Sequence, residues 1–251
     1  MVLFKSLFKR SNRETIREPP EEHFFSSIYG YSDIKKLLMR AMVSKESISI
    51  LLSGPPASSK TIFLIEMTKG LDNTCYIDCT NTTGAGLIDR LFNNNIQYLL
   101  LDELEKMSKK DQNVLLNILE TGMLIETKIS KTRSKKLSNL KVFATTNNVD
   151  ALSSPMRSRF MEFHLPEYNY EQFCEIARKL LERRLGHSNR VADEIATAVW
   201  NEMNSKDIRD VLALAKLVHN IEDVSWLVQV RKKYGMTSSS EVDNSSNLYL
   251  T

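Results

Sequence analysis

One short stretch of this sequence, Gly54-Pro55-Pro56-Ala57-Ser58-Ser59-Lys60-Thr61, constrains the possible folds more than any other. An apolar run over residues 48–52 precedes it and predicts a buried strand, and residues 61–67 predict the start of a helix. A strand, a turn ending in Lys-Thr and a helix form the context of a phosphate-binding loop, in which backbone N–H groups surround a polyphosphate. In such a loop Lys60 would reach the terminal phosphates, and the Thr61 hydroxyl would ligate magnesium.

The loop departs from the common pattern at Ser59, where glycine is usual. Glycine at that position eases unusual backbone dihedrals and allows a phosphate to approach closely. An ordinary strand–turn–helix with a solvated lysine is therefore the alternative interpretation of these residues.

A second apolar strand, predicted over residues 96–103, ends in two carboxylates, Asp102 and Glu103. A strand that is apolar on both faces suits the middle of a parallel sheet. Ligands of α/β sheets bind at the carboxyl ends of the strands. We expect Asp102 to hold Mg²⁺ or its water and Glu103 to polarise a water for attack on a terminal phosphate. A helix-capping pair is the alternative, and the position of the pair downstream of the loop makes it the weaker one.

A cluster of cations lies between Gly122 and Val142, and no acidic residue occurs from Thr127 to Lys141. The segment predicts a β-hairpin with a cationic tip, which would neutralise nucleic-acid phosphates with a salt-sensitive affinity. A solvated basic turn is the alternative. The candidate nucleic-acid contacts are Lys128, Lys131, Arg133, Lys135 and Lys136.

The composition is that of a soluble globular protein, with 26% charged and 42% hydrophobic residues. The net charge of +3 is too small to imply nucleic-acid binding by itself. Cys75, Cys79 and Cys174 have no CxxC spacing, so we expect reduced, buried thiols in a cytoplasmic protein. No apolar run reaches the roughly 18 residues of a membrane span.

The chain divides into four predicted parts. Residues 1–22 form a flexible basic segment, 23–167 an α/β domain, 168–235 a small helical domain and 236–251 a disordered Ser/Asn-rich tail. The first ten residues either form a basic amphipathic helix that contacts a membrane surface or a protein partner, or belong to a poorly ordered terminus. The helical domain is predicted from four segments, which are residues 170–185, 190–203, 205–219 and 222–234.

In this order the motifs resemble those of AAA+ ATPases over residues 24–234. Residues 54–61 resemble the Walker A motif and residues 99–103 the Walker B motif. The resemblance implies a P-loop AAA+ core, with a parallel sheet flanked by helices, followed by a small all-α lid. It also implies ATP and Mg²⁺ as ligands and ATP hydrolysis as the activity.

Two further segments match family positions near the nucleotide. Ala144-Thr145-Thr146-Asn147 is similar to sensor 1, which implies that Asn147 aligns the attacking water, with Asn148 as the second choice. Ile28 and Tyr29 match the segment that packs on adenine in this family.

Two arginines complete the resemblance. Pro155-Met156-Arg157-Ser158-Arg159-Phe160 looks like the arginine-finger segment of RuvB and clamp-loader proteins. It implies that Arg159 acts in trans on ATP in the neighbouring subunit of a homo-oligomer. Ser205-Lys206-Asp207-Ile208-Arg209-Asp210 is similar to sensor 2, which implies that Arg209 reaches the γ-phosphate from the lid. A surface ion pair and a local helix pair are the alternatives for these arginines.

Within the family, the hairpin resembles those of RuvB-like, minichromosome maintenance and MoxR-type ATPases, and the arginine-finger segment is most similar to that of RuvB-like Holliday-junction ATPases. We expect no winged-helix domain after the lid, because the sequence leaves no room for one. The predicted function is an ATP-driven, ring-forming motor that remodels DNA. The alternatives are a MoxR-type ATPase that acts on protein clients through the hairpin and the N-terminal segment, and a nucleotide-dependent switch with weak hydrolysis, which Ser59 suggests.

Overall fold

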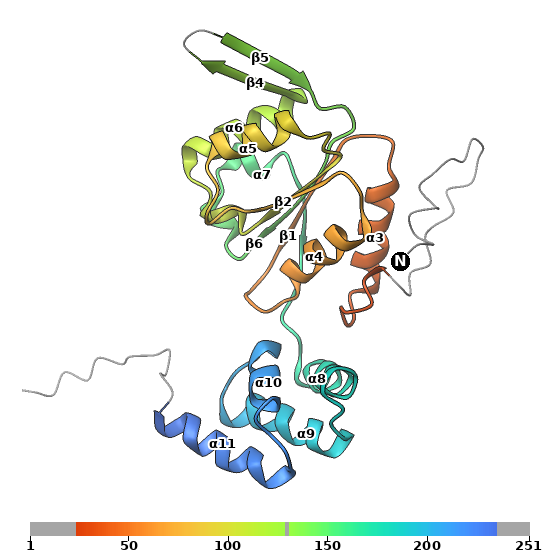
Figure 1. Ribbon diagram of the computed structural model, residues 1–251, viewed down its shortest axis with the longest axis vertical. Helices are drawn as coiled ribbons and strands as arrows, with labels where there is room; N and C mark the ends of the chain where they lie inside the picture. Colours follow the sequence, from red (N-terminus) through yellow and green to blue (C-terminus); the bar gives the residue numbers. More distant parts are fainter. Residues whose placement is uncertain (1–23, 129–130, 235–251) are drawn as a thin grey trace, which may run out of the picture. The chain divides into compact units, whose positions relative to one another are not determined.

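The computed structural model describes residues 24–128 and 131–234, and it describes no side chains for residues 127–131. The predicted N-terminal segment, residues 1–22, and the predicted tail, residues 236–251, lie outside the described residues. The chain forms two compact units, one that ends at Tyr168 and one that begins at Asn169 (Figure 1).

The first unit contains a five-stranded sheet whose neighbouring strands are all parallel, in the order β2-β3-β6-β1-β7. The strands are β1 (Ile48–Ser53), β2 (Thr74–Asp78), β3 (Tyr98–Asp102), β6 (Lys141–Thr146) and β7 (Met161–His164). β3 lies between β2 and β6 and is buried along its whole length, as its continuous apolar sequence predicts.

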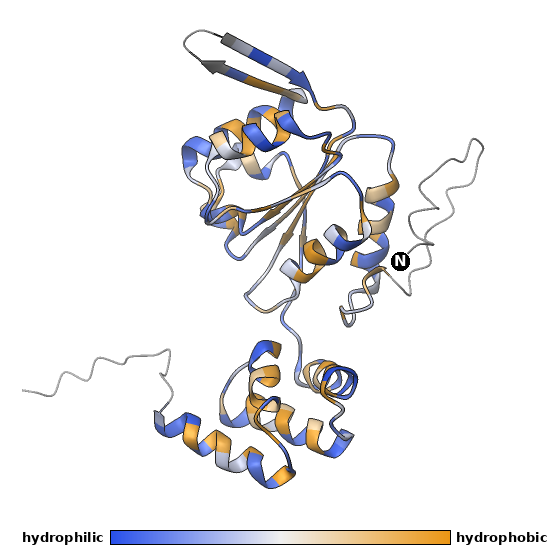
Figure 2. Cartoon of the chain, in the orientation of Figure 1, coloured by the Kyte–Doolittle hydropathy of each residue, from blue (hydrophilic) through white to orange (hydrophobic). Residues whose placement is uncertain are grey.

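Alternate residues of the strands supply two separate cores, one on each face of the sheet. Leu99 and Leu101 pack with residues of α5 and α6, whereas Tyr98 and Leu100 pack with residues of α3 and α4. The strands are mostly apolar in Figure 2, and the helices that cover them carry apolar and polar residues on different sides. The helices of this unit are α3 (Ser32–Val43), α4 (Lys60–Gly70), α5 (Gly84–Asn93), α6 (Lys109–Thr121) and the short α7 (Ser154–Arg157). The predicted α/β P-loop fold is confirmed.

Local sequence explains where several elements begin and end. α6 begins after Ser108, whose hydroxyl accepts from the Asp111 N–H, and it ends at Gly122, which has a φ of 64°. α5 begins at Gly84, because the Thr83 hydroxyl accepts from the Gly86 N–H and caps the helix.

The predicted hairpin is present. β4 (Met123–Lys128) and β5 (Lys131–Lys136) pair antiparallel and form a separate two-stranded sheet. The hairpin follows α6 and extends from the side of the sheet that α5 and α6 cover (Figure 1).

The second unit is helical, and its buried residues include Phe173, Ile195 and Val211. α9 continues into a π-helical turn, η3 (Ala198–Glu202). Residues 205–207, which were expected to be helical, precede α10 instead, because the Asp207 carboxylate accepts from the Arg209 N–H and caps the helix. The helices are α8 (Tyr170–Leu185), α9 (Asn189–Thr197), α10 (Ile208–Ala215) and α11 (Ile221–Tyr234). Over residues 24–128 and 131–234, no helix is both long and apolar enough to cross a membrane.

Candidate functional site

The predicted phosphate-binding loop joins β1 to α4 and has an unusual backbone. Gly54 has a φ of +147°, and Ala57 and Ser59 have left-handed φ values of 65° and 64°. A Cβ on Gly54 would lie 2.2 Å from the carbonyl oxygen of Leu165. Glycine is therefore required at the start of the loop both for its φ and for the close approach of the chain after β7.

Lys60, the first residue of α4, is only 5% exposed and points into the loop. Its Nζ donates to the carbonyl oxygens of Gly54 (2.8 Å) and Pro55 (2.6 Å) and to the Ser58 hydroxyl (2.9 Å). Burial lowers the pKa of Lys60 to about 8, and the opposing effect of nearby carboxylates, Glu105 first, does not restore it. The loop thus encloses a cation that is still mostly protonated at neutral pH but loses its proton at a lower pH than an exposed lysine.

Asp102, at the carboxyl end of β3, connects four elements of the sheet domain. Its Oδ1 accepts from the hydroxyls of Thr61 at the head of α4 (3.0 Å) and Thr145 on β6 (2.5 Å). Its Oδ2 accepts from the Tyr76 hydroxyl on β2 (2.8 Å), and burial and this bond raise the pKa of Tyr76. The buried carboxylate is therefore satisfied by three neutral donors and keeps the loop against the end of β3.

The oxygen atoms of Thr61 and Asp102 fit a magnesium ion that completes its shell with phosphate and water. In the part of the chain that the structure describes, no group of three or more His, Cys, Asp and Glu side chains could hold a metal alone. Mg²⁺ commonly takes one or two protein ligands together with substrate phosphates and waters, so this sparse donor set suits it.

Glu103 immediately follows β3 in a left-handed conformation, with a φ of 53°. Its N–H donates to the Thr145 hydroxyl (3.0 Å), and its Oε2 accepts from the Thr80 hydroxyl (3.1 Å). Thr145 therefore contacts both acidic residues at once.

The end of β6 carries the predicted sensor asparagine beside a third carboxylate. The Asn147 N–H donates to Glu105 Oε1 (3.0 Å), whereas Glu105 Oε2 is buried and has no hydrogen-bond partner. The side chain of Asn148 accepts from the Asp150 N–H and caps the short helix η2 (Val149–Ala151). The side chain of Asn148 is therefore engaged in capping η2.

The segment expected to pack on adenine lies before α3. Ile28 is buried in the core that contains α3 and α4, and Tyr29 is partly exposed. The carbonyl oxygen of Ile28 accepts from Lys35 Nζ (2.5 Å), which fixes this segment to the first turn of α3.

Both predicted arginines form ion pairs in the chain itself. Arg159 pairs with Glu120 near the end of α6. Arg209, in the helical unit, donates from Nε to Asp207 Oδ2 (2.8 Å). Their roles toward a nucleotide stay predictions, as do those of the other site residues.

Two of the five candidate nucleic-acid contacts are directed toward the protein. Lys135 Nζ donates to the carbonyl oxygens of Leu91 (2.8 Å) and Asn94 (2.6 Å), and so neutralises the C-terminal end of α5. Arg133 pairs with Glu126 and lies 4.6 Å above the Phe92 ring. Lys136 is exposed. The side chains of the remaining two, Lys128 and Lys131, lie outside the described part.

Four side chains at this edge were not predicted from the sequence. Tyr76, Thr80 and Thr145 contact Asp102 or Glu103, and Glu105 contacts Asn147. Thr145 belongs to the predicted sensor 1 segment, but its contact with Asp102 depends on β6 lying next to β3. The registers pair Asp78 with Asp102 and Leu101 with Ala144, which brings these side chains to one edge. Predicting these contacts would have required knowledge of the order of the strands in the sheet.

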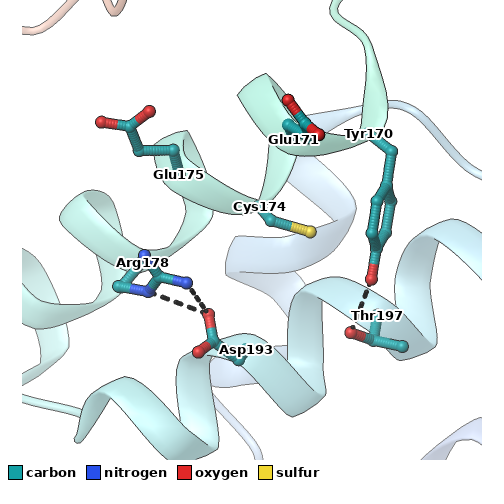
Figure 3. Close-up of a pocket in the computed structure, with 7 residues that line it drawn as sticks. All are labelled: Tyr170, Glu171, Cys174, Glu175, Arg178, Asp193 and Thr197. Atoms are coloured by element: carbon teal, nitrogen blue, oxygen red, sulfur yellow. Dashed lines mark hydrogen bonds and ion pairs between the residues drawn. The ribbon is translucent and has the colours of Figure 1, made fainter.

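A separate pocket of about 370 Å³ lies in the helical unit between α8 and α9 (Figure 3). Arg178 pairs with Asp193 at 2.7 Å, and the Tyr170 and Thr197 hydroxyls are 3.1 Å apart. None of the predicted site residues lines this pocket.

Comparison with known proteins agrees with this fold and this loop. Residues 50–167 match the family model of the ATPase family associated with various cellular activities (AAA). The Holliday junction branch migration complex subunit RuvB of Rippkaea orientalis is 27% identical over 162 residues, which cover 59% of this chain and 44% of that protein. RuvB of Synechocystis is 28% identical over 145 residues, with 52% and 40% covered. The chain thus spans less than half the length of the curated relatives it matches.

Solved structures of Thermotoga maritima RuvB have the same fold. The Holliday junction branch migration motor of that organism has a TM-score of 0.62 at 20% identity, over 83% of this chain and 72% of that one. A point mutant of the same motor has a TM-score of 0.65 at 19% identity, over 84% and 74%.

The fold and the loop are thus similar to those of AAA-type ATPases, with helices that follow the matched residues. Among proteins of this class the chain is similar to RuvB, so the resemblance that the motifs indicated is confirmed.

Gly54→Ala tests the loop geometry. The added Cβ would meet the Leu165 carbonyl, and the φ of +147° disfavours any side chain. We expect the free energy of unfolding to fall by about 1–3 kcal/mol or more, measured by urea denaturation followed by circular dichroism. Gly30→Ala is the matched control: Gly30 also has a positive φ, but its Cβ would meet no atom within 4 Å. Equal losses for both variants would contradict the close approach.

Proposed function

We propose that this chain is an ATP-hydrolysing motor subunit. The observation that carries the proposal is the 3.0 Å hydrogen bond between Thr61 and Asp102, since it brings the head of α4 and the carboxyl end of β3 together. A triphosphate on the loop would then lie beside the carboxylates of Asp102 and Glu103. This is the arrangement that in-line attack by water on a terminal phosphate requires.

Each residue at this edge has a separate task in the proposed reaction. Lys60 would exchange its loop carbonyl partners for phosphate oxygens and stabilise their charge. Glu103 would orient and polarise the water, and Asn147 would align it. Asp102 and Thr61 would hold Mg²⁺, which when bound supplies charge neutralisation on the phosphate oxygens. Ile28 and Tyr29 would contact the adenine.

The proposed motor is a homo-oligomer. Arg159 would leave its pair with Glu120 and act on ATP bound to the neighbouring subunit, where a second positive charge stabilises the transferring phosphoryl group. Arg209 would contact the γ-phosphate from the helical unit, so hydrolysis would change the orientation of that unit.

DNA is the proposed substrate. The curated relatives are subunits of a Holliday junction branch migration complex, and the hairpin exposes cationic Lys136. Phosphate contacts of this kind supply affinity without sequence preference.

A protein client is the second candidate, and the hairpin favours it in one respect. Lys135 and Arg133 are engaged by α5, Glu126 and Phe92, which reduces the charge available to a nucleic acid. Residues 1–22 would provide a further protein contact in this case.

Glu103→Gln should separate binding from hydrolysis. The amide keeps the size of the side chain but is a poor general base, so we expect ATP turnover to fall by about 100-fold or more while a fluorescent ATP analogue still binds. Glu66→Gln, on α4 in an ion pair with Lys69, is the control and should keep the wild-type rate. Unchanged turnover in Glu103→Gln would reject the role of Glu103 in polarising the water. A wild-type protein that binds but does not hydrolyse ATP would favour the alternative of a nucleotide-dependent switch.

The affinity for ATP should fall as the pH rises above about 8. The pKa of Lys60 is about 8 in the free protein, and bound phosphates would raise it, so binding above that pH takes up a proton. Titrations with a fluorescent ATP analogue from pH 7 to pH 9.5 should show a loss approaching about tenfold per pH unit. Lys60→Arg keeps its charge over this range, and any residual binding should not depend on pH. An equally steep profile in that variant would assign the proton to another group.

Mixing experiments test the action of Arg159 in trans. Arg159→Ala and Lys60→Ala should each lower ATPase activity by about 100-fold or more, because each removes a charge from the transition state. A mixture should recover part of the activity, since some interfaces would combine an intact Lys60 with an intact Arg159. Arg157→Ala is the control, because Arg157 pairs with Asp150. Mixtures that stay inactive at every ratio would contradict the arrangement.

The hairpin predicts salt-sensitive DNA binding. Gel-shift titrations with branched and single-stranded DNA at two salt concentrations should show weaker binding for Lys136→Ala, with the salt slope reduced by about 1. Lys36→Ala, exposed on α3, is the matched control. Absence of binding at low salt would end the DNA proposal and favour a protein client.

A further inference from the structure

Ser59 is the position where this loop departs from the common pattern, and its side chain has an unexpected partner. Ser59 precedes α4 with a φ of 64°, a conformation that costs a non-glycine residue stability. A serine before a helix ordinarily caps it, but the Ser59 side chain makes no cap hydrogen bond. Its hydroxyl instead lies 2.7 Å from the hydroxyl of Tyr168, which is 109 residues away in the sequence.

Tyr168 is the last residue of the first unit, directly before the helical unit begins at Asn169. It is 6% exposed, and its ring lies 5.4 Å from that of Tyr31. The Tyr31 hydroxyl in turn donates to the carbonyl oxygen of Pro166 (2.7 Å). Burial raises the pKa of Tyr168, so its hydroxyl keeps its proton throughout the ordinary pH range, and either hydroxyl of the Ser59–Tyr168 pair can be the donor.

The connector, residues 165–168, is therefore attached to the nucleotide-binding domain at three successive points. The Leu165 N–H donates to the Ser53 carbonyl (2.8 Å), Pro166 accepts from Tyr31, and Tyr168 contacts Ser59. The first and last of these points lie at the two ends of the phosphate-binding loop, at Ser53 and Ser59. The last of these contacts, between Ser59 and Tyr168, is one that a glycine at position 59 could not make.

We propose that the Ser59–Tyr168 hydrogen bond couples the conformation of the phosphate loop to that of the connector. Ser59 and Tyr168 are positioning residues in this role. A ligand that moves the backbone at Ser59 changes the position of the Tyr168 hydroxyl, and thereby the segment from which α8 starts. The response to a ligand rests on the proposed nucleotide binding, whereas the coupling itself is a property of the free protein.

Hydrogen exchange of this 251-residue chain without nucleotide tests the coupling. Tyr168→Phe should speed amide exchange in the loop, residues 54–61, and Ser59→Ala should speed it in the connector, each by about two- to tenfold, as expected for one lost hydrogen bond. The double variant should exchange no faster than the faster single variant, because both substitutions break the same bond. If each substitution affects only its own segment, the coupling is wrong.

Two controls remove a hydroxyl whose bond does not join these segments. Thr68→Ala removes a bond to the Ile65 carbonyl within α4, and Tyr98→Phe removes a buried bond to the Met42 carbonyl. Neither should change exchange in the loop or the connector. Ser59→Gly separates the effect of backbone strain from that of the hydroxyl. It should lose the coupling as Ser59→Ala does, but its melting temperature should be higher than that of Ser59→Ala, because glycine adopts a positive φ without strain.

A non-hydrolysable ATP analogue with Mg²⁺ tests the response to a ligand. It should slow exchange in both the loop and the connector of the wild-type protein, and in Ser59→Ala only in the loop. Connector protection that persists in Ser59→Ala, or that is absent from the wild-type protein while the loop is protected, would overturn the proposal. An analogue that protects neither segment would contradict the proposed function instead, and the nucleotide-free experiment would still decide the coupling.

Discussion

The rest of the site depends on one buried carboxylate, that of Asp102. A buried charge is costly unless hydrogen bonds compensate it, and Asp102 receives them from Thr61, Thr145 and Tyr76. These three donors come from α4, β6 and β2, so the demand of one carboxylate holds three other elements at the end of β3. The position of the loop before α4 next to the carboxyl end of β3 follows from this requirement.

Backbone with positive φ values also occurs at this edge. Ala57, Ser59 and Glu103 are all non-glycine residues with positive φ values, and each lies within the loop or directly after β3. Such conformations persist where surrounding contacts determine them, and they occur often at functional sites. Here the contacts are the carbonyl oxygens that surround Lys60 and the hydrogen bonds of Thr145 and Tyr168. These conformations lower the stability of the protein, and they keep the charged groups at this edge in a fixed arrangement.

Local sequence patterns were sufficient to predict helices and strands, but they did not predict which of these elements contact one another. The apolar run of β3 was predicted from adjacent residues, and the structure has this strand. The cap at Ser108 and the end of α6 at Gly122 likewise depend on residues within a few positions of one another. The hairpin was also predicted, but the contacts of Lys135 with the end of α5 were not. A run of lysines indicates charge, and only the packing of β5 against α5 shows which of those charges is already neutralised.

The sequence by itself determined the order of the motifs: a phosphate loop, an acidic strand end, a polar strand end and two arginines in succession. The order of the motifs can be predicted from the sequence because each motif consists of residues that are adjacent in the chain. The tertiary structure alone decided that β6 lies between β3 and β1, and hence that Thr145 contacts Asp102. It also decided that Tyr168 contacts Ser59. Contacts across 43 or 109 residues depend on how strands pair and how chain segments pack, and no local pattern specifies that pairing.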